Sequence, residues 1–354
     1  MKILLKYGLI LLNLIAILAM LIAYSSVYIS PARYWIPAVF GLAYPYILFV
    51  NILFVFYWLI KKSKMVFLSL FLIMSGYNYL YSYIRIKSKT SDQKGITICS
   101  YNVKNFAGPD NKTDRRWNQV IIQKFLKDQN QDVVCLQEID SFSIKGFNPF
   151  HVSPTSPDST FYSTIARKNG NLIIFSKYPI VGRGDIYFKN TPNMIIFADL
   201  KIKKDTFRIY NCHLQSYQFP AASINALNST SMEDQNQNLR DARFLGSRIK
   251  RTLIERTKQV ERLKDHIGHS PYPVIVCGDF NDTPVSYTYR MIKRDLKDAF
   301  VESGIGTGNT FKGRLLSFRI DYILHSSEVA AYNFQVGKVK YSDHNPVSCT
   351  LVRK

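Results

Sequence analysis

The chain has 354 residues, enough for one large domain or two smaller ones, and its net charge is +21, from 46 Lys and Arg against 25 Asp and Glu. Its five cysteines form no CxxC or Cys/His spacing, which argues against structural zinc and against a disulfide framework. Each cysteine lies in or beside an apolar run typical of a strand, so we expect buried single thiols. Residues 1–94 hold ten Lys and Arg and one acid, so that 36 basic and 24 acidic residues remain for residues 95–354.

Three long uncharged runs open the chain, at residues 7–29, 34–60 and 65–84. A helix needs roughly 20 apolar residues to span a bilayer, and each run reaches that length. A cleaved signal peptide is the alternative for the first run, but that run is long and two more follow it. We therefore expect three transmembrane helices within residues 1–84. Asn13, Asn51 and Asn78 lie inside the runs, where hydrogen bonds between helices are the usual role of such side chains.

The basic residues at the ends of the runs bear on the topology. With an inside amino terminus, five of them lie in the cytoplasm and five on the opposite side, so the positive-inside count is tied. The charges that precede the first helix usually dominate, and here they favour an inside amino terminus. Three crossings then place the rest of the chain outside the cytoplasm. We expect a multi-pass protein of the cell membrane with this orientation.

A short polar linker at residues 85–95 leads to a region, residues 96–354, in which strands and helices alternate. We expect strands at 96–103, 133–139, 172–176, 194–202, 207–214, 274–280, 320–324 and 346–352, and helices near 114–128 and 236–267. Short turns between the runs at 180–188, 194–202 and 205–214 indicate that part of the sheet is antiparallel. Mixed sheets covered by helices predict a layered α/β sandwich.

Polar residues stand at strand ends where packing does not require them. The apolar run Val274–Cys277 leads into Gly278-Asp279-Phe280-Asn281, and alternation places Asp279 and Asn281 on one face. Comparable positions in or after other strands are held by Asn102, Gln137, Glu138, His213, Asp321, Asp343 and His344. Each has a structural alternative, such as a turn-capping Asp, a hydrogen-bonded His or an ion pair between Asp321 and Arg319. Jointly they supply the oxygen ligands and the general base that metal-assisted phosphoester hydrolysis requires.

The order and the amino-acid sequences of these segments resemble the motifs of the endonuclease/exonuclease/phosphatase superfamily, whose fold is that of deoxyribonuclease I. The matching segments are Ser100–Asn102, Gln137–Glu138, Asn211–Leu214, Gly278–Asn281, Arg319–Tyr322 and Ser342–His344. The resemblance covers about residues 96–354. It implies a four-layer α/β sandwich with a Mg²⁺-dependent site at the rim of two central sheets, with Mn²⁺ as an alternative metal.

The resemblance also implies the ligands of that metal. Glu138 corresponds to the main metal-binding carboxylate, Asn102 stands beside it, and Asp343 is a further acid at the metal site. Mg²⁺ prefers carboxylates, amides and water, and it neutralises charge on phosphate oxygens, so the chemistry of this set agrees with the assignment.

Five further residues correspond to the catalytic groups of the family. His344 resembles the general base that takes a proton from the attacking water, and a histidine with its ordinary pKa suits that task at neutral pH. Asp321 resembles the acid that orients the imidazole. Asp279 would position or activate the nucleophile, and Asn281 would contact the phosphate. His213 matches the histidine that steadies the scissile phosphate or the leaving oxygen.

Two segments bear on the substrate. Some nucleases of the family carry a second acid that pairs with the residue matching His213. Here Arg167 and Lys168 occupy that neighbourhood, which argues against strictly deoxyribonuclease-like behaviour. Residues 215–237 are low in charge and follow His213 directly, so they could form either a substrate-facing lid or a surface insertion.

These observations predict a membrane-tethered, Mg²⁺-dependent hydrolase of phosphodiester or phosphomonoester bonds, with nuclease activity slightly favoured. A basic surface would hold the phosphate backbone of a nucleic acid. A phospholipid or sphingomyelin-type phosphodiesterase or phosphatase is the alternative, because it would explain a catalytic domain held beside a bilayer. An inactive family domain that serves as a membrane scaffold is a third hypothesis, and the complete set of acids and histidines argues against it.

Overall fold

The structure is a computed structural model that describes residues 2–111, 113–139, 146–150, 162–165, 171–189, 191, 193–217, 235–313 and 317–354. The chain divides into two compact units. The first consists of residues 1–77, 215–260 and 285–288, and the second of residues 78–214, 261–284 and 289–354. The five cysteines are free and buried, as expected.

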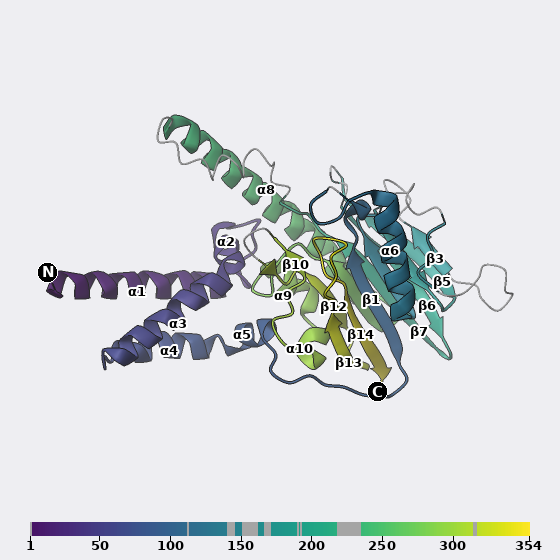
Figure 1. The fold of residues 1–354 in the computed structure, drawn as a ribbon, viewed down its shortest axis with the longest axis horizontal. Helices are drawn as coiled ribbons and strands as arrows, with labels where there is room; N and C mark the ends of the chain where they lie inside the picture. The colour runs from purple at the N-terminus through teal and green to yellow at the C-terminus, as the bar shows by residue number, and fades with distance from the viewer. Residues whose placement is uncertain are drawn as a thin grey trace. The chain divides into compact units, whose positions relative to one another are not determined.

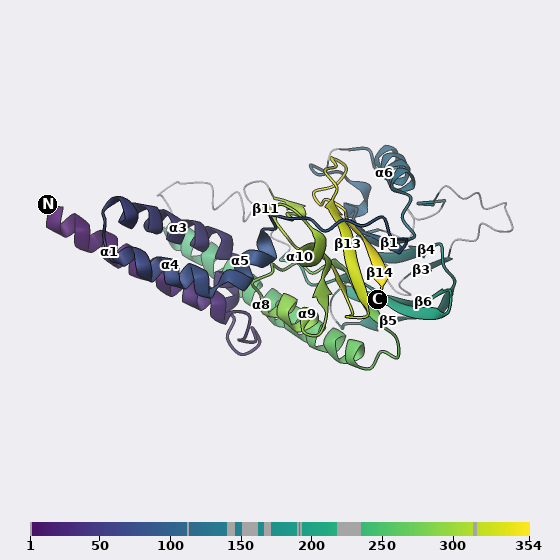
Figure 2. The same ribbon diagram turned by 90° about the horizontal axis from the view of Figure 1, so that it is seen from below.

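Apolar helices make up most of the first unit, and α1, α3 and α4 lie side by side (Figure 2). Residues 2–83 form α1 (Lys2–Ser25), α2 (Ile36–Leu42), α3 (Tyr44–Ile60), α4 (Met65–Ser75) and α5 (Tyr77–Tyr83). In the described part of the chain, only α1 is a single helix long and apolar enough to cross a membrane, from Ile3 to Ser25. The other two predicted spans are bent pairs, α2 with α3 by 68° and α4 with α5 by 63°. Up to three spans result if each pair counts as one.

The breaks in these two runs have local causes. Pro45 stands in the first turn of α3, where its missing N–H costs nothing, but it cannot continue a helix begun upstream. Gly76 separates α4 from α5, and glycine is the poorest helix former after proline.

Buried polar side chains join the helices of this unit. Asn13 Nδ2 donates to Ser69 Oγ at 2.9 Å, and Trp58 Nε1 donates to Asn13 Oδ1 at 2.8 Å. Asn51 Nδ2 donates to the carbonyl of Ala16 at 3.0 Å. The predicted role of two of the asparagines is therefore confirmed, whereas for Asn78 no such bond is found among the described residues.

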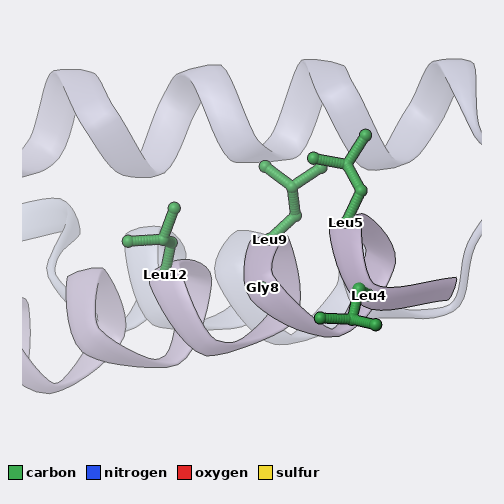
Figure 3. A pocket seen from close by; sticks show the side chains of 5 residues that line it. All are labelled: Leu4, Leu5, Gly8, Leu9 and Leu12. Carbon is green, nitrogen blue, oxygen red and sulfur yellow. The ribbon is translucent and has the colours of Figure 1, made fainter. Parts of the chain in front are cut away.

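The amino-terminal part of α1 carries a hollow on its surface. Its lining consists of four leucines and a glycine: Leu4, Leu5, Gly8, Leu9 and Leu12 (Figure 3). A surface without a polar side chain over about two and a half turns of a helix has the composition of one that faces acyl chains.

The second unit is built on two sheets of six strands among the described residues. The first sheet has the order β13-β14-β1-β2-β4-β3, with β13 (Val329–Val336), β14 (Val347–Arg353), β1 (Ile96–Asn102), β2 (Val133–Gln137), β4 (Leu172–Ser176) and β3 (Tyr162–Ile165). The second has the order β5-β6-β7-β8-β12-β9, with β5 (Ile180–Tyr187), β6 (Met194–Ile202), β7 (Asp205–His213), β8 (Val274–Asp279), β12 (Asp321–His325) and β9 (Lys297–Asp298).

Helices cover the outer faces of the two sheets (Figure 1). Apolar residues of both sheets form the central core between them. α6 (Arg115–Gln129) buries Ile122 and Leu126 against the first sheet. At the carboxyl end of α8 (Gln235–Gly268), the His266 ring lies 5.0 Å from the Phe197 ring of the second sheet. Helix, sheet, sheet and helix give the predicted α/β sandwich with mixed sheets.

Smaller elements complete the second unit. They are the 3-10 turn η1 (Lys104–Phe106), the helices α9 (Tyr287–Lys293) and α10 (Ala299–Ser303), and the hairpin of β10 (Phe311–Lys312) with β11 (Ser317–Phe318).

The segment predicted as a linker is attached to the second unit. Arg85 and Gly306 exchange two backbone hydrogen bonds, of 2.9 and 2.8 Å. Further along, Lys89 forms an ion pair with Glu302 at 3.2 Å, and Asn333 Nδ2 donates to the Ser91 carbonyl at 2.8 Å. Residues 85–91 are therefore held by specific contacts rather than running free.

Candidate metal and catalytic site

The site residues gather because of how the strands pair. In each sheet, one described pair is parallel, β1 with β2 and β7 with β8, and the other described pairs are antiparallel. A parallel pair brings two carboxyl ends to one edge, which is where α/β proteins place their ligands. Asn102 ends β1, Glu138 follows β2, His213 ends β7 and Asp279 ends β8. β12 runs antiparallel to β8, so its first residue, Asp321, lies opposite Asp279.

Asp279 lies at the centre of these groups and is 1 % exposed. Asn102 Nδ2 donates to Asp279 Oδ2 at 3.1 Å and to Glu138 Oε1 at 3.0 Å. The Nε2 atom of His213 lies 3.5 Å from Glu138 Oε1 and 4.0 Å from Asp279 Oδ2. Burial and the charge of Asp321 raise the pKa of Asp279 to about 6, against the opposing attraction of the two site histidines. Asn102 thus bridges two carboxylates from different sheets.

His344 and Asp321 form a buried dyad beside Asp279. The Nδ1 atom of His344 lies 2.9 Å from Asp321 Oδ2, and its Nε2 atom lies 3.7 Å from Asp279 Oδ2. Burial by itself lowers the pKa of His344, but the attraction of the two carboxylates and the Nδ1 hydrogen bond outweigh it and raise the pKa to about 10. The pKa is thus well above the near-ordinary value that the sequence led us to expect.

The backbone at the site adopts conformations that most residues avoid. Glu138 and Asn281 have φ values of 51° and 53°, in the left-handed region. Gly278 has a φ of 134°, and a Cβ there would lie 2.0 Å from the Cys212 carbonyl oxygen. Only glycine fits at that position, and such strained conformations concentrate at functional sites.

Asn281 is held by two hydrogen bonds. Its backbone N–H donates to Asp279 Oδ1 at 2.8 Å, and its Nδ2 donates to the Leu214 carbonyl at 2.9 Å. The first bond closes an Asx turn, which is the structural alternative that the sequence offers for this segment. The same turn fixes the Asp279 carboxylate, so the structural and the functional interpretation of Gly278–Asn281 are compatible.

Asp343 stands apart from the other acids. Its Oδ2 atom pairs with Lys104 Nζ at 2.9 Å, and the Lys104 backbone N–H donates to Asn102 Oδ1 at 3.0 Å. Sequence reasoning did not single out Lys104, although it stands two residues after Asn102, where a matching segment ends. Asp343 therefore reaches the site through Lys104 rather than through the groups around Asp279.

Other polar residues of the matching segments are structural. Gln137 Nε2 donates to Asn211 Oδ1 at 2.6 Å, which joins the two sheets. Arg319 pairs with Asp298, at 2.5 and 2.6 Å, and not with Asp321. Arg167, Lys168 and residues 218–234 of the predicted lid lie outside the described residues.

The side chains present fit a divalent cation. Two groups within the described residues offer ligand atoms that lie within 4.8 Å of one another: Glu138, His213 and Asp279, and Asp279, Asp321 and His344. His213 Nε2 and Asp321 Oδ1 are buried and lack a hydrogen-bond partner in the described part of the chain. Buried polar atoms without partners are costly, so these atoms beside carboxylates suit the binding of a cation.

Comparison with known proteins identifies the family. A sequence model described as the Endonuclease/Exonuclease/phosphatase family matches residues 99–344, more than half of the chain, so the protein belongs to this family. It is therefore a metal-dependent hydrolase of the phosphoesterase type. A model of a domain of unknown function (DUF8431) matches residues 3–83. No curated protein matches the chain.

Solved structures share the fold of the second unit. The human nocturnin catalytic domain with bound sulfate is 17 % identical, with a TM-score of 0.52 over 75 % of this chain and 97 % of that one. A family member from Bacteroides vulgatus is 17 % identical, with a TM-score of 0.52 over 74 % and 100 %. A mannosyl-6-phosphatase from Bacteroides thetaiotaomicron is 18 % identical, with a TM-score of 0.50 over 73 % and 99 %. At this identity the likeness shows the fold alone.

Proposed function

We propose that the protein is a membrane-tethered phosphoesterase that uses Mg²⁺ and a water activated by His344. The observation that carries this proposal is the buried pair of His344 and Asp321 beside the group of Glu138, His213 and Asp279, which can hold a metal. A general base and a metal group a few ångströms apart are what water attack on phosphorus requires.

Glu138 and Asp279, with His213 or Asn102, are the residues that would hold the metal, and Asp343 would join them only after leaving Lys104. When bound, a divalent cation supplies positive charge that neutralises the phosphate oxygens and offsets the attraction of Asp279 for the imidazolium, which lowers the pKa of His344. The carboxyl and amide oxygens of this set suit Mg²⁺, with Mn²⁺ as the alternative.

The hydrogen bond between His344 and Asp321 determines which nitrogen of His344 takes a proton from water. Because Asp321 is a carboxylate, His344 Nδ1 carries a hydrogen and donates it, which leaves Nε2 as the atom that takes a proton from water. The Asp321 carboxylate fixes the ring and stabilises the imidazolium that forms. His344 is 5 % exposed, so competing bulk water has little access to it.

Asp279, Asn281 and His213 take the remaining roles. Asp279 faces the Nε2 atoms of both histidines and would orient the attacking water between them. His213 would steady the phosphate or the leaving oxygen. The Nδ2 atom of Asn281 is occupied by the Leu214 carbonyl, so its contact with a phosphate requires that this bond opens.

The tether is the remaining part of the proposal. Three spans within residues 1–84 require that the pairs α2–α3 and α4–α5 each cross as one bent helix. The catalytic region then lies outside the cytoplasm, with a nucleic acid or a phospholipid headgroup as its substrate. A reporter fused after Lys94 tests the topology, because a cytoplasmic signal from it would contradict this orientation.

The activity is tested on the purified full chain in detergent. We expect Mg²⁺-dependent hydrolysis of at least one of DNA, RNA, phospholipid and phosphorylated small molecules, and loss of it in His344→Ala. His269→Ala is the matched control, because that histidine is 80 % exposed in its side chain and directly follows the end of α8. An absence of Mg²⁺-dependent turnover on all four substrates would sink the proposal.

A further inference from the structure

Three exposed isoleucines gather on the second unit. Ile84, Ile86 and Ile305 are 45 %, 91 % and 61 % exposed. The two backbone hydrogen bonds between Arg85 and Gly306 hold their segments side by side. We call these three side chains the isoleucine patch. Single exposed apolar residues are normal, whereas exposed apolar residues that the fold brings together from two distant segments are typical of a binding surface.

The guanidinium of Arg85 adds a positive charge beside the isoleucine patch. Its guanidinium lies over the Tyr81 ring, 3.6 Å from the centroid. Its Nε and Nη1 atoms are buried and have no hydrogen-bond acceptor among the described residues. A guanidinium recognises phosphate through paired N–H groups, and a phosphate reaches these two buried donors when the guanidinium turns away from the Tyr81 ring. Lys87, also exposed, adds a second positive charge next to Ile86.

We propose that the isoleucine patch and Arg85 rest on the lipid bilayer, with the isoleucines at the boundary of headgroups and acyl chains and Arg85 on a lipid phosphate. Ile84 directly follows Tyr83, the last residue of α5, at the end of the third apolar run. The chain therefore delivers the patch to the membrane surface. Apolar side chains with basic neighbours are the composition of surfaces that bind this interface.

The patch is also close to the active site along the chain. The segment from Gly306 to Phe311 can extend over at most about 18 Å. The Phe311 ring lies 5.1 Å from the His344 ring. A bilayer at the patch therefore lies within a short stretch of chain from His344, and the substrate class that fits is a phosphoester carried at the membrane surface. This step rests on the proposed function, whereas the bilayer contact itself does not.

The contact is tested on the full chain in nanodiscs of phosphatidylcholine and phosphatidylglycerol. Ile305→Cys is labelled with an environment-sensitive fluorophore, which is selective because the native cysteines are buried. Val181→Cys is the matched control, since Val181 is 60 % exposed on β5. We expect brominated phosphatidylcholine to quench the label at position 305 several-fold more than the label at 181. Equal quenching at both positions would overturn the proposal.

Position 305 is the informative one. Ile86 stands near the membrane because of its place in the sequence, but Ile305 is more than 200 residues away and is brought there only by the Arg85–Gly306 bridge. Quenching at 305 therefore reports the surface that the fold presents to lipid.

The substrate class is tested by a ratio of rates. For the full chain we compare hydrolysis of a nanodisc phospholipid with hydrolysis of soluble bis(p-nitrophenyl) phosphate. We expect Arg85→Gln and Ile305→Ser to lower the phospholipid rate about tenfold, as lost phosphate and apolar contacts do, and to leave the soluble rate unchanged. Two outcomes would refute a membrane-borne substrate. Either the variants lose activity equally on both substrates, or the wild-type protein hydrolyses the soluble substrate and not the phospholipid. Inactivity on both would instead refute the proposed function and leave the quenching result standing.

Discussion

Asp321→Asn separates the charge of the dyad from its shape. Asp321 is 1 % exposed, its Oδ2 atom accepts from His344 Nδ1 at 2.9 Å, and Asn has the same volume and an oxygen for the same bond. The substitution therefore keeps the imidazole close to its place but removes the negative charge that stabilises the imidazolium. An amide can also present its NH₂ group to Nδ1, which would favour the wrong tautomer.

The size of the effect follows from the separation of the charges. Two unit charges about 4 Å apart interact by about 4 kcal/mol at an effective dielectric constant of about 20. An energy of that size corresponds to about a thousandfold in an equilibrium or a rate. We therefore expect the rate constant kcat of Asp321→Asn to fall by about 10³-fold, within the range that a positioned base contributes. Removing the carboxylate also lowers the pKa of His344.

The assay is the pH dependence of kcat/KM for wild type and variant, with saturating Mg²⁺. The acidic limb, which reports deprotonation of the base, should move to lower pH in Asp321→Asn while the maximum falls. A variant that keeps more than half of the wild-type rate, with an unmoved acidic limb, would show that Asp321 does not act on His344 in the reaction.

Three further predictions follow from single contacts. Removal of metal by a chelator should abolish activity, and Glu138→Ala should raise the Mg²⁺ concentration for half-maximal rate by more than about tenfold in a metal titration. Arg319→Leu leaves the buried Asp298 carboxylate unpaired and should destabilise the fold by about 3–5 kcal/mol, seen as a lower Tm in detergent, whereas the exposed Arg294→Leu should not. Burial raises the pKa of Glu302, but hydrogen bonds from its neighbours outweigh burial and lower it to about 2. This stabilisation is present above the unfolded pKa of about 4.3 and is lost as the pH falls through about 2, so Glu302→Gln should flatten the acid limb of a stability–pH curve.

Most of the longer strands, and the residues that gather at the candidate site, could be predicted from the sequence because their signals are local. β3 and β13 were not predicted. Val274–Asp279 and Leu172–Ser176 are apolar runs with sharp polar ends, and the structure has strands there. Once the order of the segments identifies the fold, it follows that Glu138, Asp279 and His344 lie close together. Each prediction depended on residues that are neighbours in sequence or on a shared edge of a sheet.

Partners across the structure could not be predicted in this way. Arg319 and Asp321 are two residues apart and of opposite charge, and strand alternation would place them on one face. Arg319, however, lies before β12, which begins at Asp321, so alternation does not apply to this pair. Arg319 meets Asp298 instead, and Asp321 meets His344. The bends at Pro45 and Gly76 had local signals, but apolar length was given more weight than those two residues. The contacts of residues 85–91 depend on Glu302 and Asn333, which no pattern near the linker indicates.

The matching segments contain residues that build the site as well as residues that act in it. A site made from the edges of two sheets works only if the sheets keep their spacing, because Glu138 comes from one and Asp279 from the other. Gln137 and Asn211 fix that spacing directly beneath them. Asn211 accepts from Gln137 at 2.6 Å and donates to the carbonyls of Leu136 and Ile173 at 2.9 and 2.8 Å. These bonds are fully buried, where hydrogen bonds are most directional and most costly to lose. The amide in the Gln137-Glu138 pair is thus required for the position of the acid that follows it.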